Sequence, residues 1–160
     1  YGGIYVSHMR DEGSALLDSV EETLQIGEIG DCPVEISHHK VIGKSNWGKV
    51  VDSLEMIDQA VAKGRDVTAD QYPYTARSTM LFALVQNGAF AAGETRPMGK
   101  SEPSEVLLCS VPGRTDYEGR SLQSFVEEFD VPGEDAANKL LRDVSPDILV
   151  AALGMCSSRY

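Results

Sequence analysis

The sequence predicts an α/β fold: a partial (β/α)8 TIM-like barrel with parallel strands and crossover helices. Short apolar runs alternate with helical segments through the first half of the chain. Two of these runs end in Ser-His, at His8 and His38, and a third ends at Asp70. An open doubly wound sheet fits the same alternation, but the nearly constant spacing and the absence of a Gly-rich phosphate loop favour the barrel.

Local signals place each element of the first half, residues 1–80, which is interpreted as a βαβαβ barrel segment with metal-site strand ends. Residues 3–8 form a short apolar strand. Residues 14–29 place apolar side chains on one helical face, and Gly30 is expected to stop this helix. A second strand follows and ends at His38.

The next helix carries the clearest helical apolar stripe of the chain, over residues 47–61. Ser45 or Asn46 is expected to cap its start, and Gly64 is expected to end it. A third strand over residues 66–72 completes the predicted unit of three strands and two helices.

The second half is interpreted as two further segments. Residues 81–104 combine glycines and prolines without sustained periodicity, which indicates a loop or lid insertion, or alternatively a disordered linker. Residues 105–160 are expected to continue the barrel, with strands over 105–111 and 147–153 and helices over 122–129 and 134–144. The chain starts with Tyr-Gly-Gly and ends soon after an apolar run, so we expect an internal fragment of a longer protein, with a processed small protein as the alternative.

Composition excludes some classes of function. The net charge is -11 and the isoelectric point is about 4.6, which disfavours nucleic acid as a partner because phosphate binding needs a basic surface. The longest apolar stretches, residues 80–85 and 148–153, are far shorter than the roughly 20 residues of a membrane-spanning helix. The three cysteines, Cys32, Cys109 and Cys156, are widely spaced and no secretion signal precedes them, so we expect free thiols in the cytoplasm.

His8 and His38 are the candidate metal ligands. In a barrel, chemistry collects at the carboxyl ends of the strands, and both histidines follow a predicted strand. Neutral imidazole is a common zinc ligand, and ligands from neighbouring strand ends can converge on one ion. The alternative is that each imidazole makes only local hydrogen bonds. Asp70, at the third strand end, is expected to act as a ligand, as a base or as an orienting group.

Charged residues follow both histidines. Side chains alternate along an extended segment, so Lys40 is expected to point to the same side as His38, where it could hold a substrate carboxylate. The alternative is a surface lysine in a loop. Arg10 is expected to pair with Asp11 or Glu12.

The sequences around these positions resemble those of the N-acyl-D-amino-acid deacylases, or D-aminoacylases, of the amidohydrolase superfamily. The resemblance is carried by YVSHMRDE at residues 5–12, EISHHK at 35–40, NWG at 46–48 and DVTADQYPYTA at 66–76. It is strong over the first 80 residues, weaker from residue 105 to 155, and poor over 81–104.

The resemblance implies a zinc-dependent hydrolase that cleaves the amide of N-acyl-D-amino acids, giving a D-amino acid and a carboxylate. His8 matches the family's metal ligand after strand five and His38 the one after strand six, so the resemblance assigns the chain to about strands five to seven and the elements that follow. Lys40 matches a residue that grips the α-carboxylate of the substrate. The family's general acid/base aspartate is expected outside these 160 residues, so no catalytic residue is assigned within the chain. We therefore expect the isolated chain to be inactive, and to cover its open sheet edges by self-association or with the remainder of the barrel.

Two alternatives stay open at this point. One is another amidohydrolase, acting on cyclic amides; activity on hydantoins rather than on acetylated D-amino acids would identify it. The other is a non-catalytic, fragmentary barrel module, which predicts no bound metal and tight self-association.

Overall fold

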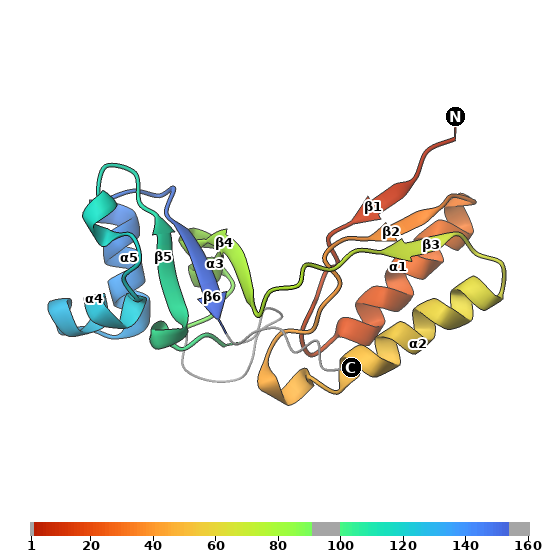
Figure 1. Ribbon diagram of the computed structural model, residues 1–160, viewed down its shortest axis with the longest axis horizontal. Helices are drawn as coiled ribbons and strands as arrows, with labels where there is room; N and C mark the ends of the chain where they lie inside the picture. Colours follow the sequence, from red (N-terminus) through yellow and green to blue (C-terminus); the bar gives the residue numbers. More distant parts are fainter. Residues whose placement is uncertain (1, 91–99, 154–160) are drawn as a thin grey trace. The chain divides into compact units, whose positions relative to one another are not determined.

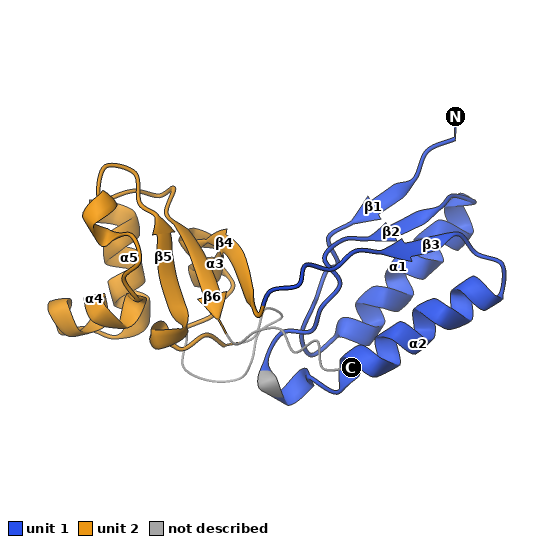
Figure 2. Ribbon diagram, viewed as in Figure 1, with its two compact units in different colours: residues 1–74, 157–160 blue, residues 75–156 orange. Residues whose placement is uncertain are grey.

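The computed structural model describes residues 2–90 and 100–153, apart from the side chain of Lys44. The chain divides into two compact units after Tyr74, which Figure 2 colours separately. We call the described residues up to Tyr74 unit 1 and those from Thr75 onward unit 2.

Unit 1 is a three-stranded parallel sheet with two helices (Figure 1). Its elements follow the chain in the order β1 (Tyr5–Ser7), α1 (Leu16–Gly30), β2 (Val34–Ile36), α2 (Lys49–Ala62) and β3 (Val67–Ala69). The strands are ordered β1-β2-β3, so each crossover helix connects neighbouring strands. The predicted alternation of parallel strands and helices is confirmed here, although no sheet in the described ranges closes into a barrel.

The core of unit 1 lies between the sheet and its two helices. Along β2, Val34 and Ile36 are buried and Glu35 between them is half-buried, as the alternation of side chains on a strand requires. Leu16 and Val20 of α1 and Ile57 of α2 pack into the same apolar cluster. This layer of helices on one face holds the strand ends in a fixed register, and the strand ends carry the candidate site.

The end of α1 and the start of α2 show how far the local sequence predicts where a helix ends or begins. α1 ends at Gly30, as predicted, and Asp31 takes the left-handed conformation with φ 46°, which lets its backbone N–H reach the carbonyl of Glu28. The predicted cap of α2 is wrong. Residues Lys44–Asn46 form a 3-10 turn, α2 begins later at Lys49, and the Asn46 amide donates to the carbonyl of Ile42 instead.

Gly27 marks the tightest approach between α1 and the sheet. A Cβ at this position would lie 2.2 Å from Val34 Cγ2 and 3.2 Å from the carbonyl oxygen of Cys32. Valine is stiff and Val34 is buried, so neither neighbour can move aside easily. We expect overpacking in Gly27→Ala to lower the free energy of unfolding by about 1–3 kcal/mol. The higher helix propensity of alanine offsets about 1 kcal/mol of this loss.

Urea denaturation of the Gly27→Ala variant measures this effect. Gly48→Ala is the matched control, because a Cβ there meets nothing within 4 Å and the backbone is already helical, with φ -64°. Equal stability of the two variants would contradict the close packing of α1 on β2.

Unit 2 is built differently. Its sheet contains β4 (Ala76–Met80), β5 (Val106–Ser110) and β6 (Leu149–Leu153), in the order β4-β6-β5, and both pairings are antiparallel (Figure 1). The helices of this unit are α3 (Leu81–Gln86), α4 (Leu122–Phe129) and α5 (Gly133–Asp143). Phe125 of α4, Leu140 of α5 and Val150 of β6 are fully buried.

The parallel strands predicted for the whole chain are therefore wrong for unit 2. The elements at 105–111, 122–129, 134–144 and 147–153 exist close to their predicted bounds. Strand direction depends on which partner each strand meets, and local periodicity does not report the partner. The remaining strand of this sheet, β4, was not predicted, because its polar residues Arg77, Ser78 and Thr79 give no apolar pattern.

The segment at 81–104, predicted to be a loop or lid, begins with the helix α3, and its end enters a 3-10 turn over Pro103–Glu105. Residues 91–99 lie outside the described residues.

The described cysteines, Cys32 and Cys109, are free thiols, and Cys156 lies outside the described residues. Among the helices that the structure describes, none has the length and apolar character needed to span a membrane.

Candidate metal centre

The two predicted histidines lie together at the carboxyl ends of β1 and β2. Ser7 pairs with Ile36 in the parallel sheet, so the strands end at the same edge, and His8 and His38 follow them closely. His8 Nδ1 is 2.9 Å from His38 Nε2, and the ring centroids are 4.6 Å apart. The structure therefore brings both rings to one place, as the sequence pattern requires.

Asp70 holds the backbone of the second histidine. It follows β3, and its carboxylate accepts a hydrogen bond from the His38 N–H at 2.5 Å, while its carbonyl accepts from the His39 N–H at 2.8 Å. His38 itself has φ 43°, a left-handed conformation that residues other than glycine rarely adopt. Of the three roles expected for Asp70, the structure shows an orienting one, because its hydrogen bonds stabilise this turn.

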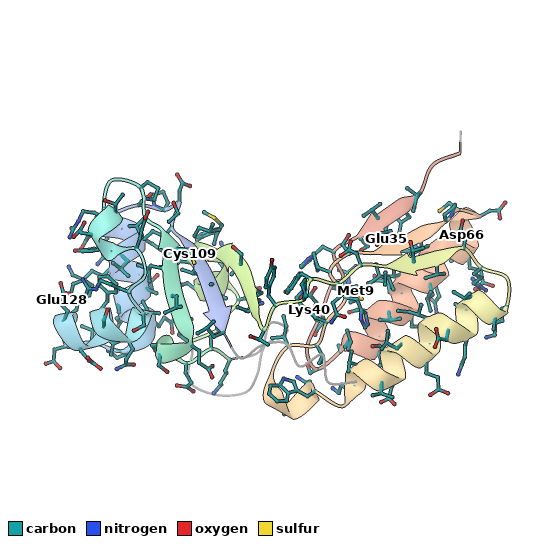
Figure 3. All side chains as sticks on the ribbon, in the orientation of Figure 1. Met9, Glu35, Lys40, Asp66, Cys109 and Glu128 are labelled. Atoms are coloured by element: carbon teal, nitrogen blue, oxygen red, sulfur yellow. The ribbon has the colours of Figure 1, made fainter. Side chains whose placement is uncertain are left out.

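Lys40, which Figure 3 labels, follows β2, and its side chain contacts the same cluster. It is buried, with 5% of its surface exposed, so the alternative of a surface lysine is wrong. Its Nζ lies 2.5 Å from Glu12 Oε1, 3.0 Å from the carbonyl oxygen of His38 and 2.9 Å from His38 Nδ1. Lys40 thus points to the side of His38, as predicted. Lys40 Nζ also lies over the ring of Tyr72, 5.8 Å from the ring centroid.

Glu12 also belongs to this cluster, although no pattern in the sequence marks it as a site residue. Its side chain is 5% exposed, and Oε1 lies 3.0 Å from His38 Nδ1 and 4.0 Å from His8 Nδ1. The expected pairing of Arg10 with Asp11 or Glu12 is wrong, because Arg10 forms an exposed two-pronged pair with Glu22. With Arg10 turned away, Glu12 is the buried counter-charge of Lys40.

Comparison with known proteins shows which proteins this sequence resembles. No protein-family model matches the chain. Over 95 residues it is 48% identical to a D-aminoacylase from Alcaligenes xylosoxydans xylosoxydans, a match that covers 59% of this chain and 19% of that protein. Over 80 residues it is 44% identical to an N-acyl-D-glutamate deacylase from the same organism, covering 50% of this chain and 16% of that protein.

The chain is a homologue of the N-acyl-D-amino-acid deacylases.

The resemblance seen in the sequence is therefore confirmed, and the family is one of enzymes. The chain spans about a fifth of the length of these curated relatives.

Solved structures agree with this relationship. The crystal structure of a D-aminoacylase, described as defining a novel subset of amidohydrolases, matches 98% of this chain and 28% of its own with a TM-score of 0.75 and 34% identity. A second D-aminoacylase structure, from work on the functional role of its binuclear metal centre, matches at 33% identity with a TM-score of 0.75, again over 98% of this chain and 28% of that one. An N-acyl-D-glutamate deacylase from Bordetella bronchiseptica shares the fold at 24% identity and a TM-score of 0.76, covering 96% of this chain and 28% of that one.

The cluster of this deacylase homologue has a donor set that fits a metal ion. His8, Glu12 and His38 offer ligand atoms within 4.8 Å of one another. Two imidazoles and a carboxylate form a familiar zinc donor set, and nitrogens that share a tetrahedral zinc lie about 3.3 Å apart for Zn–N bonds of about 2.0–2.1 Å. The 2.9 Å between His8 Nδ1 and His38 Nε2 is close to that separation. The rings therefore need only a small shift to share an ion.

His39 of the deacylase motif is not part of this cluster. Its Nε2 lies 2.9 Å from Ser53 Oγ of α2, behind the strand end, where packing was expected. Burial lowers the pKa of His39 below its usual range; the charge of Lys40 adds to this effect and Glu12 opposes it. Burial therefore favours the neutral form of the His39 imidazole, which packs against α2.

Proposed function

We propose that this chain supplies the metal-binding and carboxylate-binding part of a zinc-dependent hydrolase that converts N-acyl-D-amino acids to a D-amino acid and a carboxylate. The observation that carries the proposal is the approach of His8 Nδ1 to His38 Nε2, at 2.9 Å, beside a buried lysine. Homology to deacylases supports the choice of substrate class, and the donor set supports zinc.

In this proposal His8 and His38 would hold the ion. A zinc ion bound there would supply Lewis acidity. Asp70 accepts a hydrogen bond from the His38 N–H and so stabilises the left-handed conformation of His38 in the turn after β2. No described residue is assigned as the general acid or base; we propose an aspartate outside the chain for that role.

Lys40 is proposed to bind the α-carboxylate of the substrate. An ammonium group has three N–H donors. Glu12 Oε1, the carbonyl oxygen of His38 and His38 Nδ1 surround these donors, and a substrate carboxylate would replace the ring nitrogen as the third acceptor. Because the same lysine lies beside His38, a substrate held by it has its acylated nitrogen close to the proposed metal. A buried cation is also a selective partner, since few neutral groups can replace the carboxylate without loss.

A chimaera tests the proposal. The chain replaces the homologous segment of the Alcaligenes D-aminoacylase, and release of free D-amino acid from N-acetyl-D-amino acids is measured with added zinc. We expect the chimaera to hydrolyse D but not L substrates and to be inactive on hydantoins. A folded, zinc-loaded chimaera that releases no D-amino acid would refute the proposal.

Lys40→Met in the same chimaera separates substrate binding from metal binding. We expect kcat/KM for N-acetyl-D-amino acids to fall by about 10–100-fold, the loss of a hydrogen bond to a charged group, with the zinc content unchanged. An N-acetyl amine without a carboxylate is the control substrate, and its slow hydrolysis should not change.

A further inference from the structure

The Glu12 carboxylate is held where the loops after β1 and β2 meet. The backbone carbonyl of Glu12 accepts a hydrogen bond from the N–H of Ile42, at 2.6 Å. Its neighbour Asp11 is fixed as well, because the Asp11 N–H donates to Ser19 Oγ of α1 at 3.0 Å. The side chain of Glu12 is 5% exposed, so its charge is shielded from water and acts mainly on the groups beside it.

One oxygen of this carboxylate balances the charge of Lys40. Glu12 Oε1 accepts a hydrogen bond from Lys40 Nζ at 2.5 Å, and the two side chains are 5% and 6% exposed. Together the ammonium and the carboxylate carry no net charge. A substrate carboxylate that approaches Lys40 in the metal-free chain therefore meets a neutral pair, and the Asp70 carboxylate adds negative charge beside His38. We expect the metal-free chain to bind carboxylates weakly.

The same oxygen also belongs to the candidate metal cluster. Glu12 Oε1 lies 3.0 Å from His38 Nδ1 and 4.0 Å from His8 Nδ1. The ligand atoms that these three residues offer lie within 4.8 Å of one another. A divalent cation held by the histidines would add two positive charges near a carboxylate that already pairs with Lys40. Electrostatic interactions between buried groups are strong at such distances, so the ion and the ammonium would compete for one negative charge.

We propose that Glu12 couples the metal-binding part of the site to the carboxylate-binding part. A divalent cation at His8 and His38 draws on the Glu12 carboxylate, so the positive charge of Lys40 becomes available to a substrate carboxylate. A carboxylate bound to Lys40, in turn, offsets the repulsion between the ammonium and the ion. Each ligand must then strengthen the binding of the other by the same factor, and such coupling is typically about 5–150-fold. The inference rests on the proposed function for both of its binding sites.

Two variants separate this coupling from simpler arrangements. If the two parts of the site were independent, a carboxylate would leave the metal affinity unchanged. If the carboxylate bound the ion directly, it would raise the metal affinity without any need for Lys40. Lys40→Met removes the ammonium and keeps Glu12 and both histidines. Glu12→Leu combined with Lys40→Met removes the whole pair, and apolar residues of similar volume commonly replace such pairs without loss of folding.

Calorimetric titration of the full chain with Zn²⁺ measures the coupling, in sodium acetate and in sodium chloride of the same ionic strength. We expect the wild type to bind Zn²⁺ about 5–150-fold more tightly in acetate. Lys40→Met should bind Zn²⁺ more tightly than the wild type in chloride, because no ammonium competes for the Glu12 carboxylate, and acetate should add nothing. The double variant should lose this gain, because it lacks that carboxylate.

Three results would overturn the coupling. The first is an equal Zn²⁺ affinity of the wild type in both salts. The second is an acetate effect of the same size in Lys40→Met as in the wild type, which would place acetate on the ion itself. The third is a double variant that binds Zn²⁺ as tightly as Lys40→Met, which would exclude Glu12 as the coupling residue.

The reverse titration tests reciprocity. Acetate is added to the chain with and without Zn²⁺, and the NMR chemical shift of the Lys40 side chain reports how much acetate is bound. We expect acetate to bind more tightly with Zn²⁺, by the same factor by which acetate strengthens Zn²⁺ binding. A wild-type chain that binds no Zn²⁺ would refute the proposed function together with the coupling, whereas Zn²⁺ binding that acetate does not change would refute the coupling alone.

Discussion

Replacing His38 with alanine is expected to remove zinc binding from the chain. His38 contributes the nitrogen that faces His8, so its loss leaves an exposed imidazole and a carboxylate that is already paired with Lys40. We expect the affinity for zinc to fall by more than the roughly 10–100-fold typical of a residue that only supports a ligand. His8→Ala should have the same effect, because neither ring alone forms a chelate. Zinc content by elemental analysis and affinity by calorimetry measure both changes.

The neighbouring histidine provides the matched control. His39 is adjacent to His38 in the sequence, but its ring contacts Ser53 behind the strand end. His39→Ala should therefore lower stability by removing a buried hydrogen bond and still bind one zinc per chain. Zinc bound with unchanged affinity in His38→Ala would exclude the assigned site, and loss of zinc in His39→Ala alone would move it to the other face.

Replacing Glu12 with alanine is expected to lower the stability of the chain more than the Gly27→Ala, His39→Ala or Glu22→Ala substitutions do. The side chains of Lys40 and Glu12 are 6% and 5% exposed, so Glu12→Ala leaves a buried ammonium without its counter-charge. Removing one partner of a buried pair costs about 3–5 kcal/mol, a large share of the total stability of about 5–15 kcal/mol of a typical domain. Urea denaturation should show a lower midpoint with a similar slope.

Two variants test the reason for that loss. Glu12→Leu with Lys40→Met should recover most of the stability, because no charge is then buried alone. Glu22→Ala breaks the exposed Arg10–Glu22 pair, and it should leave the midpoint almost unchanged, since water and salt screen that pair. If Glu12→Ala were as stable as Glu22→Ala, the buried Glu12–Lys40 pair would make no net contribution to stability.

The sequence predicted the elements of unit 1 well because their signals are local. The apolar stripe of α2, the stop at Gly30 and the runs before His8 and His38 each depend on neighbouring residues. The parallel order of the strands followed from the alternation of strand and helix, since short crossovers leave little choice of topology. Placing two histidines at neighbouring strand ends followed in turn.

Unit 2 shows where local signals stop. Helices α4 and α5 and two of its strands were predicted close to their observed bounds. Helix α3 falls in the segment interpreted as a loop, the polar strand β4 has no apolar pattern, and the pairing of β4 with β6 reverses the expected direction. An antiparallel sheet depends on contacts between residues that are far apart in the sequence, such as Met80 and Leu149.

By itself, the sequence determined which residue types stand at the strand ends of this deacylase homologue: His8, His38, Lys40 and Asp70. Only the tertiary structure decided how they interact. It turned Arg10 toward Glu22, buried Glu12 beside Lys40, and placed the carboxylate against one nitrogen of His38. Burial and atomic distance decide whether a charged residue is a solvated surface group or a partner within a site, and both arise only when separate loops fold against each other.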